Sequence, residues 1–472
     1  MQKKYIILFF IIILAVGIAF RLYSWQHLNS LTSDEAVHSM PGVMSARIIL
    51  NGFNFGYIQK FISNYRVAAA AAVFYPYGYP MFATISFLIF GFNELAARLP
   101  SMLFSILIIY AVYLLAKVIF KKEEVALWSA FFAAINPWFI SWGGRALVDL
   151  PLAVFTVFSV YFLIIGIEQD KIKYWILSAI CCGFAFLMKP PGILISPILA
   201  LIVVYHKGFR ALFQKKFIIL FLIILFFFFS YFGLGILARF ILPSTGLVVP
   251  NLGYKLYQSV SHWFGDALTY AEPGDPNWRT LQAWICYPEL LIPQLGGLIV
   301  LILAVIGFIE MSVKENWKKT TPLALFVILI YLVFSILNNK DGRYTIAYLP
   351  FFCIFSGYGI FWIGSLYEKK FAFLIITFFI ALSLISSFNM LPYENIWHTA
   401  NSGLGKTAKI ITQRKHGSVA LNGENDMIGP NNLGFYMMLN DPKLNYFVIC
   451  WLNDPQNADY IISAEDASFI EK

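Results

Sequence analysis

The chain has 472 residues, of which 60% are hydrophobic and only 12% are charged. Soluble globular domains are about half apolar and a quarter charged, so this composition excludes that class and indicates an integral membrane protein. The net charge of +9 is modest for the length, and it favours anchoring at a membrane surface over binding to nucleic acid. The five cysteines are too few and too irregularly spaced for a disulfide framework or a zinc site.

Apolar runs along the chain predict eleven membrane-spanning helices. The first covers Tyr5–Phe20 after Lys3 and Lys4, and it lacks a clear cleavage site, which favours an uncleaved span with a cytoplasmic N-terminus. The others are approximately Ala97–Phe120, Val125–Trp142, Leu147–Ile167, Tyr174–Met188, Gly192–Tyr205, Phe217–Ile241, Glu289–Ile309, Pro322–Leu337, Tyr344–Ile363 and Phe371–Leu391. Each is long enough, or nearly so, for a hydrocarbon core of about 30 Å.

The short apolar segment Pro80–Phe92 decides the topology. If it stays at the outer face, the predicted cytoplasmic loops all carry basic residues on the same side as Lys3 and Lys4, as the positive-inside rule requires. If it spans, every later loop inverts and the rule fails. We therefore place the segment at the outer face, which puts the following outside: Asn29–Gly42, Gly143–Asp149, Leu242–Pro288, Asn338–Arg343 and everything after Pro392.

The end of the chain differs in composition from the rest, and it predicts a small extracytoplasmic α/β domain (396–472) after a transmembrane domain (1–395). The stretch "GKTAKIITQRK" predicts a surface helix. The stretches "GSVALNG", "NYFVICW" and "ADYIISA" predict strands, with the helix "NNLGFYMML" between the first two. The stretch "GLGKT" is not a phosphate loop, because Ala400 stands where that pattern requires glycine, so we expect no nucleotide.

Two adjacent acids, Asp34 and Glu35, follow the first span in "NSLTSDEAVHSMPG". The spacing Thr32-x-x-Glu35 is typical of a capping box, and it predicts a surface helix over Ser33–Leu50 that is interrupted near Pro41. One interpretation is therefore that the acids only cap a helix. The other is catalytic, because a capped helix start would hold a carboxylate in a fixed position.

A third acid, Asp149, lies at the outer start of a predicted span, on the same side as Asp34. An ionisable residue at membrane depth is commonly functional, although an ion pair with Arg145 one helical turn earlier would explain it equally well. Basic residues also gather at outer span ends, where the positive-inside rule disfavours them: Arg21, Arg98, Arg145, Lys189, Arg239, Lys340 and Arg343. Together they indicate an anionic, phosphate-like ligand. Beside it, Asp34 and Asp149 would act as a base or hold a divalent cation.

These stretches resemble the conserved blocks of GT-C membrane glycosyltransferases. More specifically, they resemble glycosyltransferase family 39, which includes protein O-mannosyltransferases and lipid A aminoarabinose transferases. "SDEAVHSM" resembles the Asp-Glu motif, and "YPYGYPMFATISFLIFGFNELAARLPSMLFSIL", "GGRALVDLPLAVF", "FLMKPPGILI" and "NNKDGRYTIAYLPFF" resemble four further blocks in the same order. The likeness covers most of residues 1–365. One departure is that Pro76 and Pro80 are separated, where the family usually has two adjacent prolines.

The resemblance implies an all-α polytopic GT-C fold, with about 11–13 transmembrane helices and outer juxtamembrane helices. It also implies a polyprenyl-phosphate sugar donor drawn from the membrane lipids, an extracytoplasmic acceptor and inversion at the sugar. Asp34 matches the catalytic acid, Glu35 accompanies it, and Asp149 matches the second acid. Basic residues would face the donor phosphate: Lys189, Lys340 and Arg343 at matching positions, and Arg98 and Arg145 as further outer cations.

The alternative is a transporter or flippase for a lipid-linked sugar. Transporters place charges and broken helices near the bilayer midplane and often consist of two repeated halves. Here the charges lie at the outer ends of the predicted spans, and the sequence shows no internal repeat. A purely structural membrane protein would leave the outer basic residues unexplained. The sequence therefore favours a cell-membrane glycosyltransferase whose site lies outside.

Overall fold

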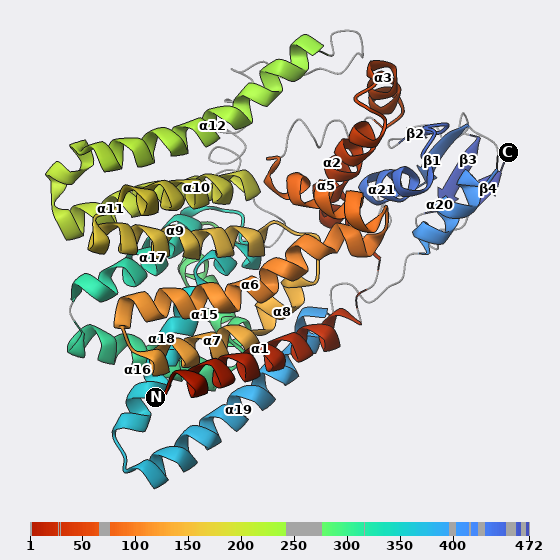
Figure 1. The fold of residues 1–472 in the computed structure, drawn as a ribbon. Coiled ribbons are helices and arrows are strands. Elements are labelled where there is room, and N and C mark those ends of the chain that lie inside the picture. Colours follow the sequence, from red (N-terminus) through yellow and green to blue (C-terminus); the bar gives the residue numbers. More distant parts are fainter. Residues whose placement is uncertain are drawn as a thin grey trace.

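The computed structural model describes residues 2–26, 28, 30–65, 76–241, 276–315, 317–395, 403–414, 417–422, 430–449, 459–463 and 469–471. Most of these residues form helices, which lie side by side in a bundle, and a small α/β domain lies at one end of it (Figure 1). The predicted combination of an all-α membrane domain and an α/β tail is therefore confirmed.

The bundle accounts for every predicted span. Its helices are α1 (Lys3–Trp25), α6 (Glu94–Phe120), α7 (Glu123–Ile135), α8 (Pro137–Gly143), α9 (Asp149–Gln169), α10 (Ile172–Met188), α11 (Ile195–Lys207), α12 (Lys215–Ile241), α15 (Leu281–Leu295), α16 (Leu298–Lys314), α17 (Trp317–Ile336), α18 (Leu349–Ser365) and α19 (Lys369–Asn395). Within the described residues, five helices are long and apolar enough to cross a membrane, and two bent pairs raise the number to seven. Four shorter apolar helices accompany them, so the protein is a multi-pass membrane protein.

Two predicted spans are broken in the structure. Helices α7 and α8 meet at an angle of 52° because Pro137 has no N–H to continue the first helix, and the Asn136 side chain accepts the Phe139 N–H at 2.9 Å to cap the second. Helices α15 and α16 meet at 111° around Gly296 and Gly297, whose φ angles of 92° and 114° suit glycine alone.

The loops predicted to be cytoplasmic lie together at the end of the bundle opposite the α/β domain (Figure 1). Ion pairs join loops that are distant in sequence: Lys121 with Glu168 at 3.3 Å, Lys122 with Glu315 at 2.8 Å, and Lys216 with Asp170 at 2.6 Å. The described loops thus fall into the two groups that the charge pattern predicted, and residues 242–275 of the predicted outer loop Leu242–Pro288 lie outside the described part of the chain.

Three further helices lie at the opposite end: α2 (Ser33–Leu50), α3 (Phe55–Asn64) and α5 (Gly78–Phe90). The predicted capping box begins α2, because Thr32 accepts the Glu35 N–H and the Glu35 carboxylate accepts the Thr32 N–H at 3.0 Å. The helix does not break at Pro41 as predicted. It packs there so closely on α5 that a Cβ on Gly42 would come within 2.7 Å of the Ala83 Cβ. With 13 residues, α5 is short for a span, as expected.

The α/β domain contains α20 (Leu404–Thr412), β1 (Ser418–Asn422), α21 (Pro430–Asn440), β2 (Phe447–Ile449), β3 (Tyr460–Ser463) and β4 (Phe469–Glu471). The sheet order is β2-β1-β3-β4, with β1 parallel to both neighbours and β4 antiparallel to β3. The predicted helices and first three strands are present, and β4 was not predicted. The predicted domain boundary follows the end of α19, and residues 396–402 lie outside the described part of the chain.

Candidate active site

The first turn of α2 presents Asp34 to an arginine from a distant part of the chain. The Asp34 side chain is 54% exposed, and its carboxylate accepts a hydrogen bond from the Arg343 guanidinium at 2.5 Å. Arg343 lies in the 3-10 helix η4 (Gly342–Ala347), and its Nε also donates to Asp341 at 2.6 Å. The Asp341 carboxylate accepts the Arg343 backbone N–H as well, at 2.8 Å, so Asp341 binds both the backbone and the side chain of the arginine.

The second acid, Asp149, is the first residue of α9 and is almost fully buried. Its carboxylate pairs with Lys189, which lies between α10 and the 3-10 helix η1 (Pro190–Leu194), at 2.7 Å. Asp149 thus pairs with Lys189, where the sequence suggested Arg145. Arg145 precedes the helix, so the two are not one helical turn apart, and its guanidinium lies 4.9 Å from the centre of the Trp142 ring.

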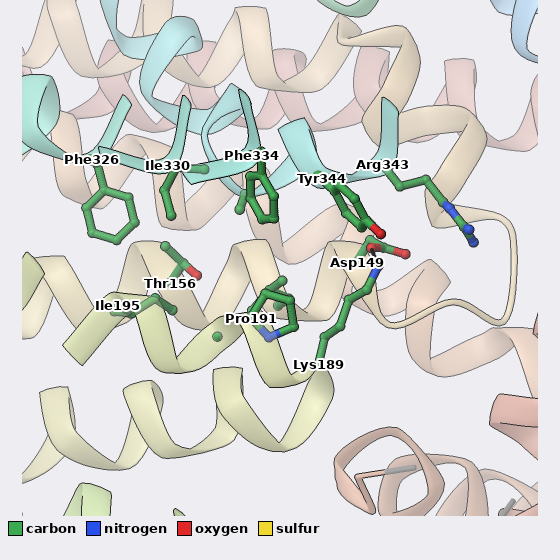
Figure 2. Close-up of a pocket in the computed structure, with 13 residues that line it drawn as sticks. Asp149, Thr156, Lys189, Pro191, Ile195, Phe326, Ile330, Phe334, Arg343 and Tyr344 are labelled. Carbon is green, nitrogen blue, oxygen red and sulfur yellow. Dashed lines mark hydrogen bonds and ion pairs between the residues drawn. The ribbon is translucent and has the colours of Figure 1, made fainter. Parts of the chain in front are cut away.

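A small pocket leads away from these charges. It lies between α9, η1 with α11, and α17, and its lining includes Asp149, Lys189, Arg343 and Tyr344 at one end and Thr156, Ile195, Phe326, Ile330 and Phe334 at the other. Figure 2 shows Asp149 and Lys189 meeting beside Tyr344, with the apolar side chains in a row beyond them. The pocket thus has a charged end and an apolar end, which suits an amphiphilic ligand with an anionic headgroup.

The charges around Asp34 keep it ionised. Burial within the site raises the pKa of Asp34, but the nearby Arg343 and Lys189 outweigh this effect and hold the pKa below its usual value. The next turn of α2 carries His38, whose pKa burial lowers to about 4, so its imidazole is neutral at physiological pH. Asp34 is therefore available as a proton acceptor at neutral pH.

Glu35 and Arg98 are bound to each other instead of facing the pocket. The Glu35 side chain is only 1% exposed, and its carboxylate accepts hydrogen bonds from Arg98 Nε at 2.8 Å and from the Ala146 N–H at 2.9 Å. Arg98 also lies 3.8 Å from Glu94 in its own helix. The expectation of a catalytic Glu35 and a phosphate-binding Arg98 therefore gives way to a buried structural pair.

Lys340 also lies away from the pocket charges. Its ammonium group donates to the backbone carbonyls of Phe334, Ser335 and Leu337, at the C-terminal end of α17. A helix C-terminus leaves carbonyls without intrahelical partners and favours a cation, so Lys340 acts as a cap. The expectation that Lys340 faces a donor phosphate is not met by this geometry.

Sequence reasoning missed Asp341 and the apolar wall of the pocket. Asp341 was visible in "NNKDGR", but nothing in the sequence connected it with Arg343. Phe326, Ile330 and Phe334 recur every four residues on α17, yet α17 is apolar throughout, so the spacing did not stand out.

That Asp34 and Asp149 hold a divalent cation stays a prediction. Within the described residues, no three His, Cys, Asp or Glu side chains are grouped closely enough to share a metal ion. The two carboxylates instead face Arg343 and Lys189. We therefore derive no catalytic step through a metal.

Sequence comparison finds a matching family and a related protein. The family model described as dolichyl-phosphate-mannose-protein mannosyltransferase matches residues 75–236. The undecaprenyl phosphate-alpha-4-amino-4-deoxy-L-arabinose arabinosyl transferase 2 of Proteus mirabilis (strain HI4320) is 22% identical over 287 residues. That alignment covers 58% of this chain and 48% of the relative, which is about half of its length.

Two solved structures share the fold. ArnT from Cupriavidus metallidurans, bound to undecaprenyl phosphate, matches with a TM-score of 0.66 and 14% identity, over 93% of this chain and 86% of its own. The archaeal oligosaccharyltransferase AglB from Archaeoglobus fulgidus, in complex with an inhibitory peptide and a dolichol-phosphate, matches with a TM-score of 0.57 and 11% identity, over 97% of this chain and 65% of its own. The chain is therefore a multi-pass membrane protein with the GT-C fold, and it is similar to glycosyltransferase family 39.

Proposed function

We propose that the protein is a membrane glycosyltransferase that moves a sugar from a polyprenyl-phosphate donor to a hydroxyl of a lipid, glycan or protein acceptor outside the cytoplasm. The observation that carries the proposal is the pocket between α9, η1 and α17. It offers Lys189 and Arg343 to a phosphate and a row of apolar side chains to a lipid chain. The names of the matched proteins, which refer to dolichyl and undecaprenyl phosphates, support the same donor class.

The proposed reaction assigns a role to each group at the charged end. Asp34 accepts the proton of the acceptor while the acceptor attacks the anomeric carbon of the sugar. The bond between that carbon and the phosphate oxygen breaks, and the polyprenyl phosphate leaves as an anion. Lys189 and Arg343 stabilise the charge that develops on the phosphate. Attack opposite the leaving group inverts the anomeric configuration.

Asp149 has a supporting role in this scheme. It is buried beside Lys189, and their distance of 2.7 Å fixes the ammonium group at the mouth of the pocket. Asp341 holds Arg343 in the corresponding way. Each proposed phosphate-binding cation is thus oriented by a carboxylate, which limits the reorganisation needed when the donor binds.

The proposed site lies on the extracytoplasmic side, with the N-terminus in the cytoplasm. Support comes from the basic loops gathered at the end of the bundle away from Asp34. Reporter proteins fused after Lys122 and after Pro392 test this arrangement. We expect the first to be cytoplasmic and the second extracytoplasmic, and finding both on one side would contradict it.

The donor can be found and then tested directly. Mass spectrometry of lipid-linked sugars in cells that lack the protein should show one polyprenyl-phosphate sugar accumulating. The purified protein in liposomes should transfer that sugar to an extract containing acceptors, and the Asp34→Asn variant should not. Movement of the labelled lipid across the bilayer without any transfer would instead favour a flippase.

A further inference from the structure

We propose that the C-terminal α/β domain positions the catalytic helix α2, and that Tyr436 and Asn432 of α21 act on Asp34 through the backbone of Leu31. This inference rests on the proposed function, in which Asp34 is the base. It assigns to the small domain a part in positioning the proposed base.

The contact is made at Leu31, immediately before the N-cap residue of α2. The Leu31 N–H donates to the Tyr436 hydroxyl at 3.0 Å, and the Leu31 carbonyl accepts from the Asn432 side chain at 2.6 Å. Leu31 and Asn432 are both completely buried. Both backbone groups of a residue just before the helix are therefore bound by one face of α21, which fixes where α2 begins.

The same tyrosine closes a ring of contacts around the helix start. Its hydroxyl also lies close enough to the Glu94 carboxylate of α6 for each group to shift the pKa of the other. Glu94 lies 3.8 Å from Arg98, and Arg98 pairs with Glu35 at 2.8 Å. The Glu35 carboxylate in turn accepts the backbone N–H of the N-cap residue in the capping box. The ring thus joins the α/β domain, α6 and the first turn of α2.

Asp34 lies within the segment that this ring fixes, but its side chain faces the other way. Residues on both sides of it, Leu31 and Glu35, are anchored on the buried side of α2. The Asp34 carboxylate instead accepts a hydrogen bond from Arg343. A small shift of the helix start would therefore change the position of the base relative to Arg343 and the acceptor.

The domain has other attachments, so removing one hydroxyl should not release it. Arg47 donates to the carbonyls of Met438 and Leu439 in the last turn of α21, at 2.7 and 3.1 Å. Asn64, the last residue of α3, binds Leu444, and Tyr65, which follows it, binds Asp441. These contacts lie away from Leu31, which makes the Leu31 anchor separable from docking as a whole.

The chain offers a matched pair of variants. Tyr436→Phe removes the hydroxyl that binds Leu31. Tyr446→Phe removes a buried hydroxyl of the same domain, which donates to the Ile411 carbonyl at 2.6 Å. Hydrogen exchange of the intact protein, followed by mass spectrometry, should be faster in the peptide containing Leu31 and Asp34 for Tyr436→Phe only. Equal exchange in the two variants would contradict the proposal that the Tyr436 hydroxyl anchors Leu31.

Kinetics then test the consequence for Asp34. A misplacement of about 1 Å can lower a rate by about a hundredfold, so we expect kcat of Tyr436→Phe to fall about 10- to 100-fold with an unchanged KM for the donor. Tyr446→Phe should behave as the wild type. Faster exchange at Leu31 with an unchanged kcat would overturn the positioning role. A failure of the proposed function itself would appear separately, as wild-type transfer by Asp34→Asn.

Discussion

Arg343 donates a hydrogen bond to Asp34 at 2.5 Å although the two residues are 309 positions apart in the chain. The contact joins the first turn of the outer helix α2 to the turn before α18. It brings the proposed base and a proposed phosphate-binding cation to the same point at the mouth of the pocket. The predictions below test what each partner, and each neighbouring charge, contributes.

Asp34→Asn should abolish most transfer while the protein still folds. The carboxylate is 54% exposed and is not the capping side chain, so the loss of its charge should cost little stability. Removing a general base lowers a rate by about 10²- to 10⁴-fold. Transfer by the purified variant, with polyprenyl phosphate binding measured in parallel, checks this. Normal binding with normal transfer would remove Asp34 from the chemistry.

Arg343→Gln should move the acid limb of the pH profile to higher pH. Arg343 lowers the pKa of Asp34, so without it the pKa rises and the carboxylate becomes protonated at a higher pH. The pH dependence of kcat/KM reports on groups in the free enzyme and is the quantity to measure. Arg279→Gln is the control, because Arg279 lies 5.3 Å from the centre of the Trp278 ring, away from Asp34. An acid limb that does not move would show that Arg343 does not set the pKa of the catalytic base.

Glu35→Gln should reduce the stability of the protein more than its rate of sugar transfer. Glutamine can still accept the capping hydrogen bond, but it leaves the buried Arg98 without its charged partner. Breaking a buried pair by removing one partner costs about 3–5 kcal/mol. The thermal unfolding temperature should fall, and it should partly recover in the double variant Glu35→Gln with Arg98→Met. Full stability with lost transfer would return Glu35 to a catalytic role.

Lys189→Met and Lys340→Met should have different effects on donor use and on stability, although both remove a cation near the pocket. Lys189 faces the charged end, so its loss should lower kcat/KM for the donor about 10- to 100-fold, as expected for a charge-assisted contact of about 1.5–3 kcal/mol. Lys340 caps α17, so its loss should lower the unfolding temperature and leave donor use unchanged. Equal effects of both variants on donor use would contradict the assignment.

Much of the fold follows from hydrophobicity and local signals in the sequence. Each predicted span coincides with a helix or with a bent pair of helices, because a long apolar run can satisfy its backbone only within itself when it crosses a membrane. The capping box at Thr32 was predictable for a similar reason, since all of its partners lie within four residues. The breaks at Pro137 and Gly296 had visible signals, but those signals do not state whether a span bends or continues.

The pairing of charges at the site was less predictable. The sequence identified Asp34, Asp149, Lys189 and Arg343 as candidates, yet it suggested Arg145 as the partner of Asp149. Nearness in sequence is a poor guide where the chain is not helical, and tertiary packing decides which cation reaches which acid. For the same reason, the sequence could not show that Arg98 pairs with Glu35, or that Lys340 donates hydrogen bonds to carbonyls at the end of α17.

The two ion pairs at the mouth of the pocket carry a consequence for the order of substrate binding. The proposed donor phosphate would compete with the Asp34 carboxylate for Arg343, an exchange of one anion for another, while Asp149 and Asp341 keep the two cations oriented. Once Arg343 is engaged by the phosphate, its hold on Asp34 weakens, and the carboxylate becomes a stronger base. We therefore expect an ordered reaction, with the donor first, in which the catalyst is fully active only while a sugar is present to be transferred.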